Sequence, residues 1–179
     1  MENGLNKMFE FGRHEHSLFG NIKNVFTAFV ANLLWTMFLV VFLHIGLGMK
    51  IDDIHLLISA QLTVSPAQPT IQAVIFFACI FAPLWEELAF RFVPLTIARY
   101  VECQGSLKGS SVVFPVMIGT SIIFGLAHGS VMNILMQGVC GMSLAWVMLK
   151  SGYKYSVLTH AMWNFMLLIG LPIVLGMIK

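Results

Sequence analysis

Residues 25–49 read VFTAFVANLLWTMFLVVFLHIGLGM and contain no Asp, Glu, Lys or Arg. A helix of about 20 apolar residues spans the hydrocarbon core of a bilayer, so this stretch predicts a transmembrane helix. The composition of the whole chain agrees with this prediction. Of the 179 residues, 58% are hydrophobic and only 10% are charged, whereas a typical soluble domain has about 25% charged residues. We therefore expect an integral membrane protein.

Four further apolar stretches follow, and each is long enough to be read as a span. They cover residues 71–98, 112–127, 131–149 and 156–178. We therefore predict an all-α fold, a polytopic membrane helical bundle of about five transmembrane helices. Residues 1–23 mix basic and aromatic side chains and are expected to form an interfacial N-terminal arm, with the transmembrane bundle formed by residues 24–179.

The basic residues in the connections predict the orientation. Short cytoplasmic loops of membrane proteins are enriched in Lys and Arg, and the connections on one side of the predicted bundle contain most of them. This places the N-terminus in the cytoplasm and the C-terminus outside, and we expect the plasma membrane of a bacterium. The residues on the cytoplasmic side are Lys7, Arg13, Lys23, Arg99, Lys108, Lys150 and Lys154, against Lys50 and Lys179 on the other.

The charges and the cysteines argue against several kinds of partner and site. The net charge is +2 and the basic residues form no continuous run, so nucleic-acid binding is not indicated. The three cysteines lie far apart and form no Cys-x-x-Cys pair, which argues against a disulfide framework or a thiolate zinc site. The expected partners are the lipid bilayer and a membrane-associated peptide or protein; the sequence does not specify an oligomeric state.

The second span contains three charged residues, each of which costs roughly 2.5–3.5 kcal/mol to insert into a membrane. Glu87 and Arg91 are four residues apart, so they share one helix face and are expected to pair. Glu86 is rotated by about 100° from that face. Its carboxylate therefore lacks this partner and is the candidate general base. We expect Pro83 and Pro94 to kink the helix on either side of these charges.

Two later spans contain histidines. His128 closes the third span, and Phe124, one turn earlier, is expected to pack against its ring. His160 and Asn164 are one turn apart, so the imidazole and the amide are able to donate hydrogen bonds to the same oxygen atom. Other polar residues in the spans are interpreted as interhelical hydrogen-bonding groups: His44, Asn32, Asn133 and Gln137.

Three segments of the chain follow known motifs in order. Residues 86–91 read EELAFR, residues 124–128 read FGLAH and residues 160–164 read HAMWN. They match the patterns EExxxR, FxxxH and HxxxN, and each lies in an apolar span. In these motifs the chain resembles the CPBP family, which joins the type II CAAX prenyl proteases with the Abi-type bacteriocin-processing and immunity proteins.

The resemblance implies an intramembrane endopeptidase that hydrolyses a peptide bond of a membrane-associated peptide or protein. It implies that Glu86 and His128 activate the attacking water. It implies also that His160 and Asn164 stabilise the oxyanion. The family is regarded as glutamate-dependent and metal-free, so no cofactor is expected, and the catalytic core comprises residues 71–179. The supporting residues are Glu87, Arg91 and Phe124.

Two alternatives remain open. A zinc-dependent membrane protease would use Glu86, His128 and His160 as ligands, because one carboxylate and two imidazoles form the ligand set of several zinc hydrolases. The short motif His-Glu-x-x-His is absent, however. The second alternative is a non-enzymatic membrane immunity or interaction protein on the same scaffold.

The depths of the two histidines do not agree if all helices begin at the same membrane level. At 1.5 Å per residue, His128 lies about 21–24 Å from the start of its span, and His160 about 12 Å from the start of its own. A tilt, a later start of the third span at Pro115, or a re-entrant turn at Gly129–Ser130 would bring them together.

Overall fold

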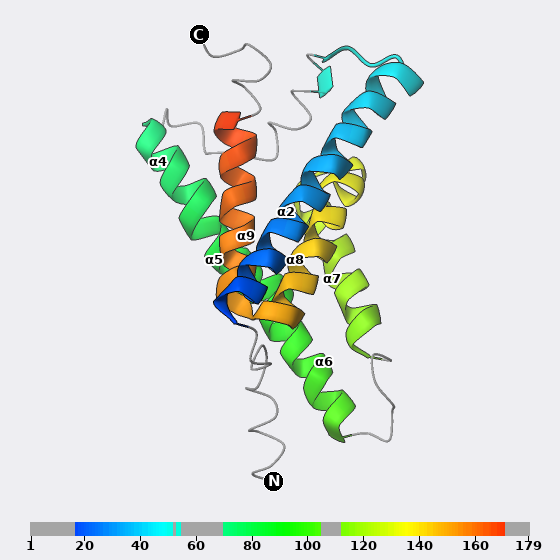
Figure 1. Cartoon of the computed structure of the whole chain (residues 1–179). Helices are drawn as coiled ribbons and strands as arrows, with labels where there is room; N and C mark the ends of the chain where they lie inside the picture. Colours follow the sequence, from blue (N-terminus) through cyan, green and yellow to red (C-terminus); the bar gives the residue numbers. More distant parts are fainter. Residues whose placement is uncertain (1–16, 52, 55–69, 105–111, 171–179) are drawn as a thin grey trace.

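The computed structural model describes residues 17–51, 53–54, 70–104 and 112–170, and most of these residues are helical (Figure 1). No strand occurs within these ranges. The predicted all-α membrane bundle is therefore confirmed. Most of the N-terminal arm, residues 1–16, lies outside the described residues, as does the end of the fifth predicted span.

The helices follow one another in five passes through the bundle. The first pass is α2 (Leu18–Val41) with the π-helical turn η1 (Phe42–Gly46). The second consists of α4 (Ile71–Phe76), η3 (Phe77–Phe81), α5 (Ala82–Glu87), η4 (Leu88–Phe92) and α6 (Val93–Gln104). The remaining passes are α7 (Val113–Ala127), then η5 (Ile134–Gly138) with α8 (Val139–Ser151), and finally α9 (Tyr153–Phe165) with η6 (Met166–Gly170).

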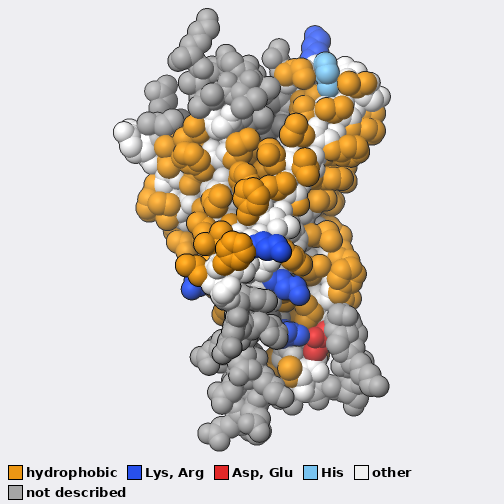
Figure 2. All heavy atoms as spheres, viewed as in Figure 1, with side chains coloured by type: hydrophobic (Ala, Val, Ile, Leu, Met, Phe, Trp, Pro, Cys, Tyr) orange, Lys and Arg blue, Asp and Glu red, His pale blue; other side chains and the backbone are white. Residues whose placement is uncertain are grey.

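Three of these passes are long and apolar enough to cross a membrane: Leu18–Gly46, Gln72–Cys103 and Ile134–Ser151. The helix Val113–Ala127 is apolar but shorter. Large hydrophobic side chains cover much of the outer surface of the bundle (Figure 2), as expected for helices whose outer faces contact lipid. Chain direction alternates from each pass to the next, so that α2 and α9 run the same way (Figure 1).

The second pass contains a π-helical turn ahead of each proline. In η3 the Ala82 N–H donates to the carbonyl of Phe77, five residues back. This wider turn ends where α5 begins, and Pro83 lies in the first turn of α5. The turn η4 ends at Phe92, two residues before Pro94. Each proline therefore occupies a position where a missing N–H is tolerated. Such π-helical turns occur frequently at functional sites.

The helix ends are not level. The second pass has an apolar helix of 32 residues. Its last segment, α6, extends well beyond the connection between α8 and α9 (Figure 1). The suggested later start at Pro115 is wrong, since α7 begins at Val113. The chain reverses after α7 at Gly129, whose φ of +96° favours glycine.

Helix α2 packs on α8 and α9 through apolar contacts and interhelical hydrogen bonds. Asn24 donates to the Ser151 hydroxyl at 3.0 Å. The Ser143 hydroxyl donates to Asn32 Oδ1 at 2.7 Å, which confirms the interpretation of Asn32 as an interhelical group. An apolar cluster that includes Leu39, Leu43, Trp163 and Leu167 joins α2 to α9. These contacts fix α8 and α9, which carry part of the candidate site.

Helix α7 approaches η5 closely at Gly125. A Cβ atom at this position would lie 2.6 Å from Ile134 Cα and 2.7 Å from the Asn133 carbonyl oxygen. Both obstacles are backbone atoms, so they do not yield as a flexible side chain does. Gly125 is therefore required for the packing of α7, which carries Phe124 and His128.

We predict that Gly125→Ala lowers the free energy of unfolding by about 1–3 kcal/mol, because overpacking forces the two helices apart. Gly119→Ala is the matched control on the same helix, since a Cβ there meets no atom within 4 Å. It should be neutral or stabilising by up to about 1 kcal/mol. Unfolding of the two variants in detergent micelles measures the difference. Equal stability of both variants would contradict the close approach.

Candidate active site

Glu87 lies at the centre of the polar cluster, at the end of α5, and its side chain is completely buried. Its Oε1 atom accepts a hydrogen bond from His160 Nδ1 at 2.9 Å and lies 3.4 Å from Arg91 Nη1. Its Oε2 atom accepts a hydrogen bond from the Ser156 hydroxyl. The predicted pairing of Glu87 with Arg91 is thus present, and two further groups from α9 contact the same carboxylate.

Arg91 is also completely buried and lies on an aromatic face. Its Cζ atom is 3.9 Å from the centroid of the Phe124 ring, which is the geometry of a cation–π interaction. Gly141 on α8 makes room for the guanidinium, because a Cβ there would overlap Arg91 Nη2 and lie 3.2 Å from Phe124 Cδ1. The charge of Arg91 is therefore balanced by Glu87 and by the ring of Phe124.

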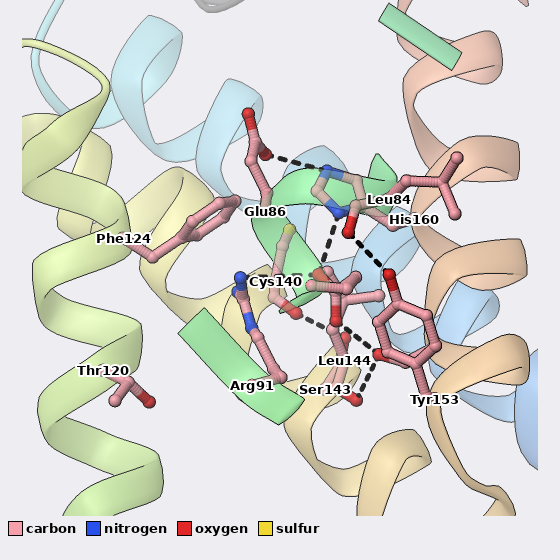
Figure 3. Close-up of polar contacts among 12 residues, drawn as sticks. Leu84, Glu86, Arg91, Thr120, Phe124, Cys140, Ser143, Leu144, Tyr153 and His160 are labelled. Atoms are coloured by element: carbon pink, nitrogen blue, oxygen red, sulfur yellow. Dashed lines mark hydrogen bonds and ion pairs between the residues drawn. The ribbon is translucent and has the colours of Figure 1, made fainter. Parts of the chain in front are cut away.

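The two adjacent carboxylates have different environments. Glu87 has three partners and no exposed surface, whereas the Glu86 side chain is 23% exposed. Glu86 Oε2 lies 3.5 Å from His160 Nε2 (Figure 3). Glu86 is therefore the carboxylate that an incoming molecule can reach, in agreement with the sequence-based distinction between the two residues.

His160 lies between these carboxylates. Its Nδ1 atom faces Glu87 at 2.9 Å and its Nε2 atom faces Glu86 at 3.5 Å. Because both neighbours are acceptors, an imidazole that donates from both nitrogens satisfies both of them. The ring is almost fully buried and is therefore oriented by Glu87 toward Glu86.

His128 follows the last residue of α7 and is fixed by its own helix. Its Nδ1 atom lies 2.7 Å from the carbonyl oxygen of Phe124, so Nδ1 is the donor of this hydrogen bond, and in the neutral ring Nε2 is then the acceptor. The ring centroids of Phe124 and His128 are 4.6 Å apart, which confirms the expected packing. The Phe124 ring also contacts His160 at 5.9 Å, so it links His128 to the cluster around Glu87.

Asn164 joins the site through the backbone of the second pass. Its Nδ2 atom donates to the carbonyl oxygen of Ala78 at 2.8 Å. The Ala82 N–H, four residues after Ala78, is bonded to the Phe77 carbonyl, and the next residue, Pro83, has no N–H to offer to the Ala78 carbonyl. Asn164 therefore supplies the hydrogen bond that the proline cannot make, and one amide hydrogen remains for another acceptor.

These contacts define a polar stripe along one face of α9, formed by Tyr153, Ser156, His160 and Asn164. The Tyr153 hydroxyl donates to the Leu84 carbonyl at 2.7 Å (Figure 3), and the other three contact Glu87 or Ala78 as described. Ser156 and Tyr153 lie outside the three sequence motifs and were not predicted as site residues. Ser156 precedes His160 by four residues, so the spacing that paired His160 with Asn164 also pointed to Ser156.

The geometry also bears on metal binding. Within residues 17–51, 53–54, 70–104 and 112–170, no three His, Cys, Asp or Glu side chains are grouped as ligands of one ion. Of the seven site residues expected from the sequence, six form one network of contacts, and Asn164, one helical turn from His160, is bound to the Ala78 carbonyl. The seven residues are Glu86, Glu87, Arg91, Phe124, His128, His160 and Asn164.

The fold and the site together define an integral membrane protein with buried acid–base groups inside a helical bundle. Residues 68–166 match the Rce1-like family, described as type II CAAX prenyl endopeptidases. Because the match covers more than half of the chain, this protein belongs to that family and is a membrane protease of the CAAX kind, which confirms the family expected from the three motifs. Neither a curated protein nor a solved structure matches the chain.

We predict that Arg91→Ala destabilises the fold by about 3–5 kcal/mol, because it leaves the Glu87 carboxylate buried without its counter-ion. Arg91→Lys should fall between this variant and the wild type, since lysine keeps the charge but lacks the planar group that lies on Phe124. Thermal unfolding in micelles provides the measurement.

The matched control is Lys154→Ala. The Lys154 ammonium lies 4.9 Å from the Tyr155 ring centroid at an exposed position, so the loss of this contact should cost less than about 1 kcal/mol. Full stability of Arg91→Ala would contradict the ion pair.

Proposed function

We propose that this protein is a glutamate-type intramembrane endopeptidase in which Glu86 and His128 activate a water molecule. The observation that carries the proposal is the difference between the two carboxylates. Glu87 is completely buried and has three partners, whereas Glu86 is partly exposed and faces only His160 among the described contacts. Glu86 is therefore free to accept a proton from water.

In the proposed reaction the water oxygen attacks the scissile carbonyl carbon while a water proton moves to Glu86. His128 Nε2 serves as a second acceptor that orients the water, because its Nδ1 is bound to Phe124. The tetrahedral intermediate then collapses, the carbon–nitrogen bond breaks, and Glu86 returns the proton to the leaving amine. No atom of the enzyme forms a covalent bond to the substrate.

His160 and Asn164 are proposed to stabilise the oxyanion as hydrogen-bond donors. His160 Nε2 points toward Glu86 and hence toward the reacting carbon. Asn164 has one amide hydrogen bound to Ala78, which orients the amide and leaves the second hydrogen for the oxyanion. The proposal requires no metal ion or other cofactor.

The substrate is proposed to be a membrane-associated peptide or protein that reaches the site from the bilayer. Trp85 precedes Glu86 in the chain and is 62% exposed, and Phe81 and Leu84 on the same helix are exposed as well. Glu86 thus lies at the border between the buried polar cluster and an apolar surface that contacts lipid. A lipid-anchored tail, as the family description suggests, fits this position.

The proposed orientation places the connection between α8 and α9 at the cytoplasmic side of a bacterial plasma membrane. Lys150 and Lys154 flank this connection, and the Asn24–Ser151 hydrogen bond brings Lys23 near it. Lys and Arg side chains are seen mainly toward this end of the bundle (Figure 2), as the positive-inside rule requires. Ser156, which contacts Glu87, is one turn from this connection, so the site lies in the cytoplasmic half.

We predict that Glu86→Gln abolishes cleavage of a membrane-associated peptide while the protein accumulates and unfolds at the wild-type temperature. Glutamine has the shape of the glutamate but does not accept a proton from water. Asp53→Asn is the matched control, because it removes an exposed carboxylate outside the site and should leave turnover unchanged. Wild-type turnover by Glu86→Gln would eliminate Glu86 as the base.

Metal removal separates the proposal from the zinc alternative. We expect the purified protein to contain no stoichiometric metal and to remain active in EDTA or phenanthroline. Catalytic zinc requires three protein ligands and an open position, so a zinc enzyme would behave in the opposite way. Metal analysis and chelator titration of the same preparation are the measurements. Stoichiometric zinc, together with activity that chelators remove and zinc restores, would overturn the glutamate mechanism.

A further inference from the structure

Ser156 is a completely buried serine on α9 that lies outside the three sequence motifs. Its hydroxyl oxygen is bonded to Glu87 Oε2 and lies 2.9 Å from the carbonyl oxygen of Leu144. A hydroxyl has one hydrogen to donate. Donation to the ionised carboxylate is the stronger of the two interactions, so Ser156 acts chiefly on Glu87.

The two oxygen atoms of Glu87 have separate partners. Oε1 faces both His160 Nδ1 and Arg91 Nη1. Oε2 has the Ser156 hydroxyl as its hydrogen-bond partner among the described residues. Without this hydroxyl, the carboxylate is free to rotate about its terminal bond and to share both oxygen atoms between Arg91 and His160.

We propose that Ser156 is a positioning residue for the reaction, which acts by fixing the Glu87 carboxylate. A fixed carboxylate keeps Oε1 directed at His160 Nδ1, and this in turn keeps Nε2 directed at Glu86, 3.5 Å away. The inference rests on the proposed function, because it assigns Ser156 to the reaction in which His160 stabilises the oxyanion. It adds Ser156 to His160 and Asn164 as a third functional residue on one face of α9.

The first test compares Ser156→Ala with the wild type in proteoliposomes, with a fluorogenic prenylated peptide as the substrate. A small misplacement of a catalytic group lowers turnover by up to about 100-fold, so we expect kcat to fall by about 10- to 100-fold while KM changes by less than about twofold. Ser156→Cys, which keeps the shape and a weak donor, should fall between the two. Ser143→Ala is the matched control, because the Ser143 hydroxyl contacts Asn32 and the Cys140 carbonyl but not Glu87. Wild-type kcat for Ser156→Ala would overturn the inference.

The second test follows the imidazole directly by NMR of ¹⁵N-histidine-labelled protein, with the signals of His160 assigned from a His160→Gln spectrum. Ser156→Ala should shift the His160 nitrogen signals and leave those of His128 in place, and Ser143→Ala should shift neither. A reduced kcat with unchanged His160 signals would assign Ser156 to helix packing alone and so overturn its positioning role. If the wild type cleaves no substrate, the proposed function fails. The His160 signals then decide separately whether Ser156 orients the imidazole.

Discussion

Glu87 is a carboxylate with no exposed surface in the middle of an apolar helical bundle, and the arrangement of four helical passes depends on how it is neutralised. An unpaired charge in such a place costs several kcal/mol. Arg91 supplies the opposite charge from the next turn, while Ser156 and His160 supply hydrogen bonds from α9. Arg91 in turn lies against Phe124 of α7 and beside Gly141 of α8. The chain therefore brings these passes together around one buried ion pair.

This constraint explains why two neighbouring glutamates have different properties. The backbone turns by about 100° between successive helical residues, so only Glu87 faces the buried cluster while Glu86 faces its edge. His160 lies between them, with Nδ1 bound to Glu87 and Nε2 facing Glu86, so the position of the Glu87 carboxylate determines how the ring faces Glu86. In the proposed mechanism the buried carboxylate positions the catalytic groups, and the partly exposed carboxylate of Glu86 accepts the proton. Positioning of this kind contributes substantially to enzymatic rates.

The sequence predicted the features that depend on local spacing. The apolar stretches predicted the helices, and separations of four residues predicted the contacts of Glu87 with Arg91 and of Phe124 with His128. Contacts between distant segments were not predictable in this way. The bond from Asn164 to the Ala78 carbonyl depends on a π-helical turn before Pro83, and hydrophobic periodicity does not reveal such a turn. The space beside Gly141 depends on the packing of three helices around Arg91. The extension of α6 beyond the α8–α9 connection belongs to a 32-residue helix, and hydropathy does not reveal how far such a helix extends past its neighbours.

The Glu87–Arg91 pair is tested most directly by a double-mutant cycle on the free energy of unfolding in micelles. The cycle uses Glu87→Gln, Arg91→Met and the variant that combines them. If the ion pair organises the bundle, each single variant leaves a buried charge alone and is strongly destabilised. The combined variant then recovers much of the loss, with a coupling energy of about 2 kcal/mol or more. Additive effects of the two substitutions would show that the residues act independently, and would contradict the central place given to Glu87.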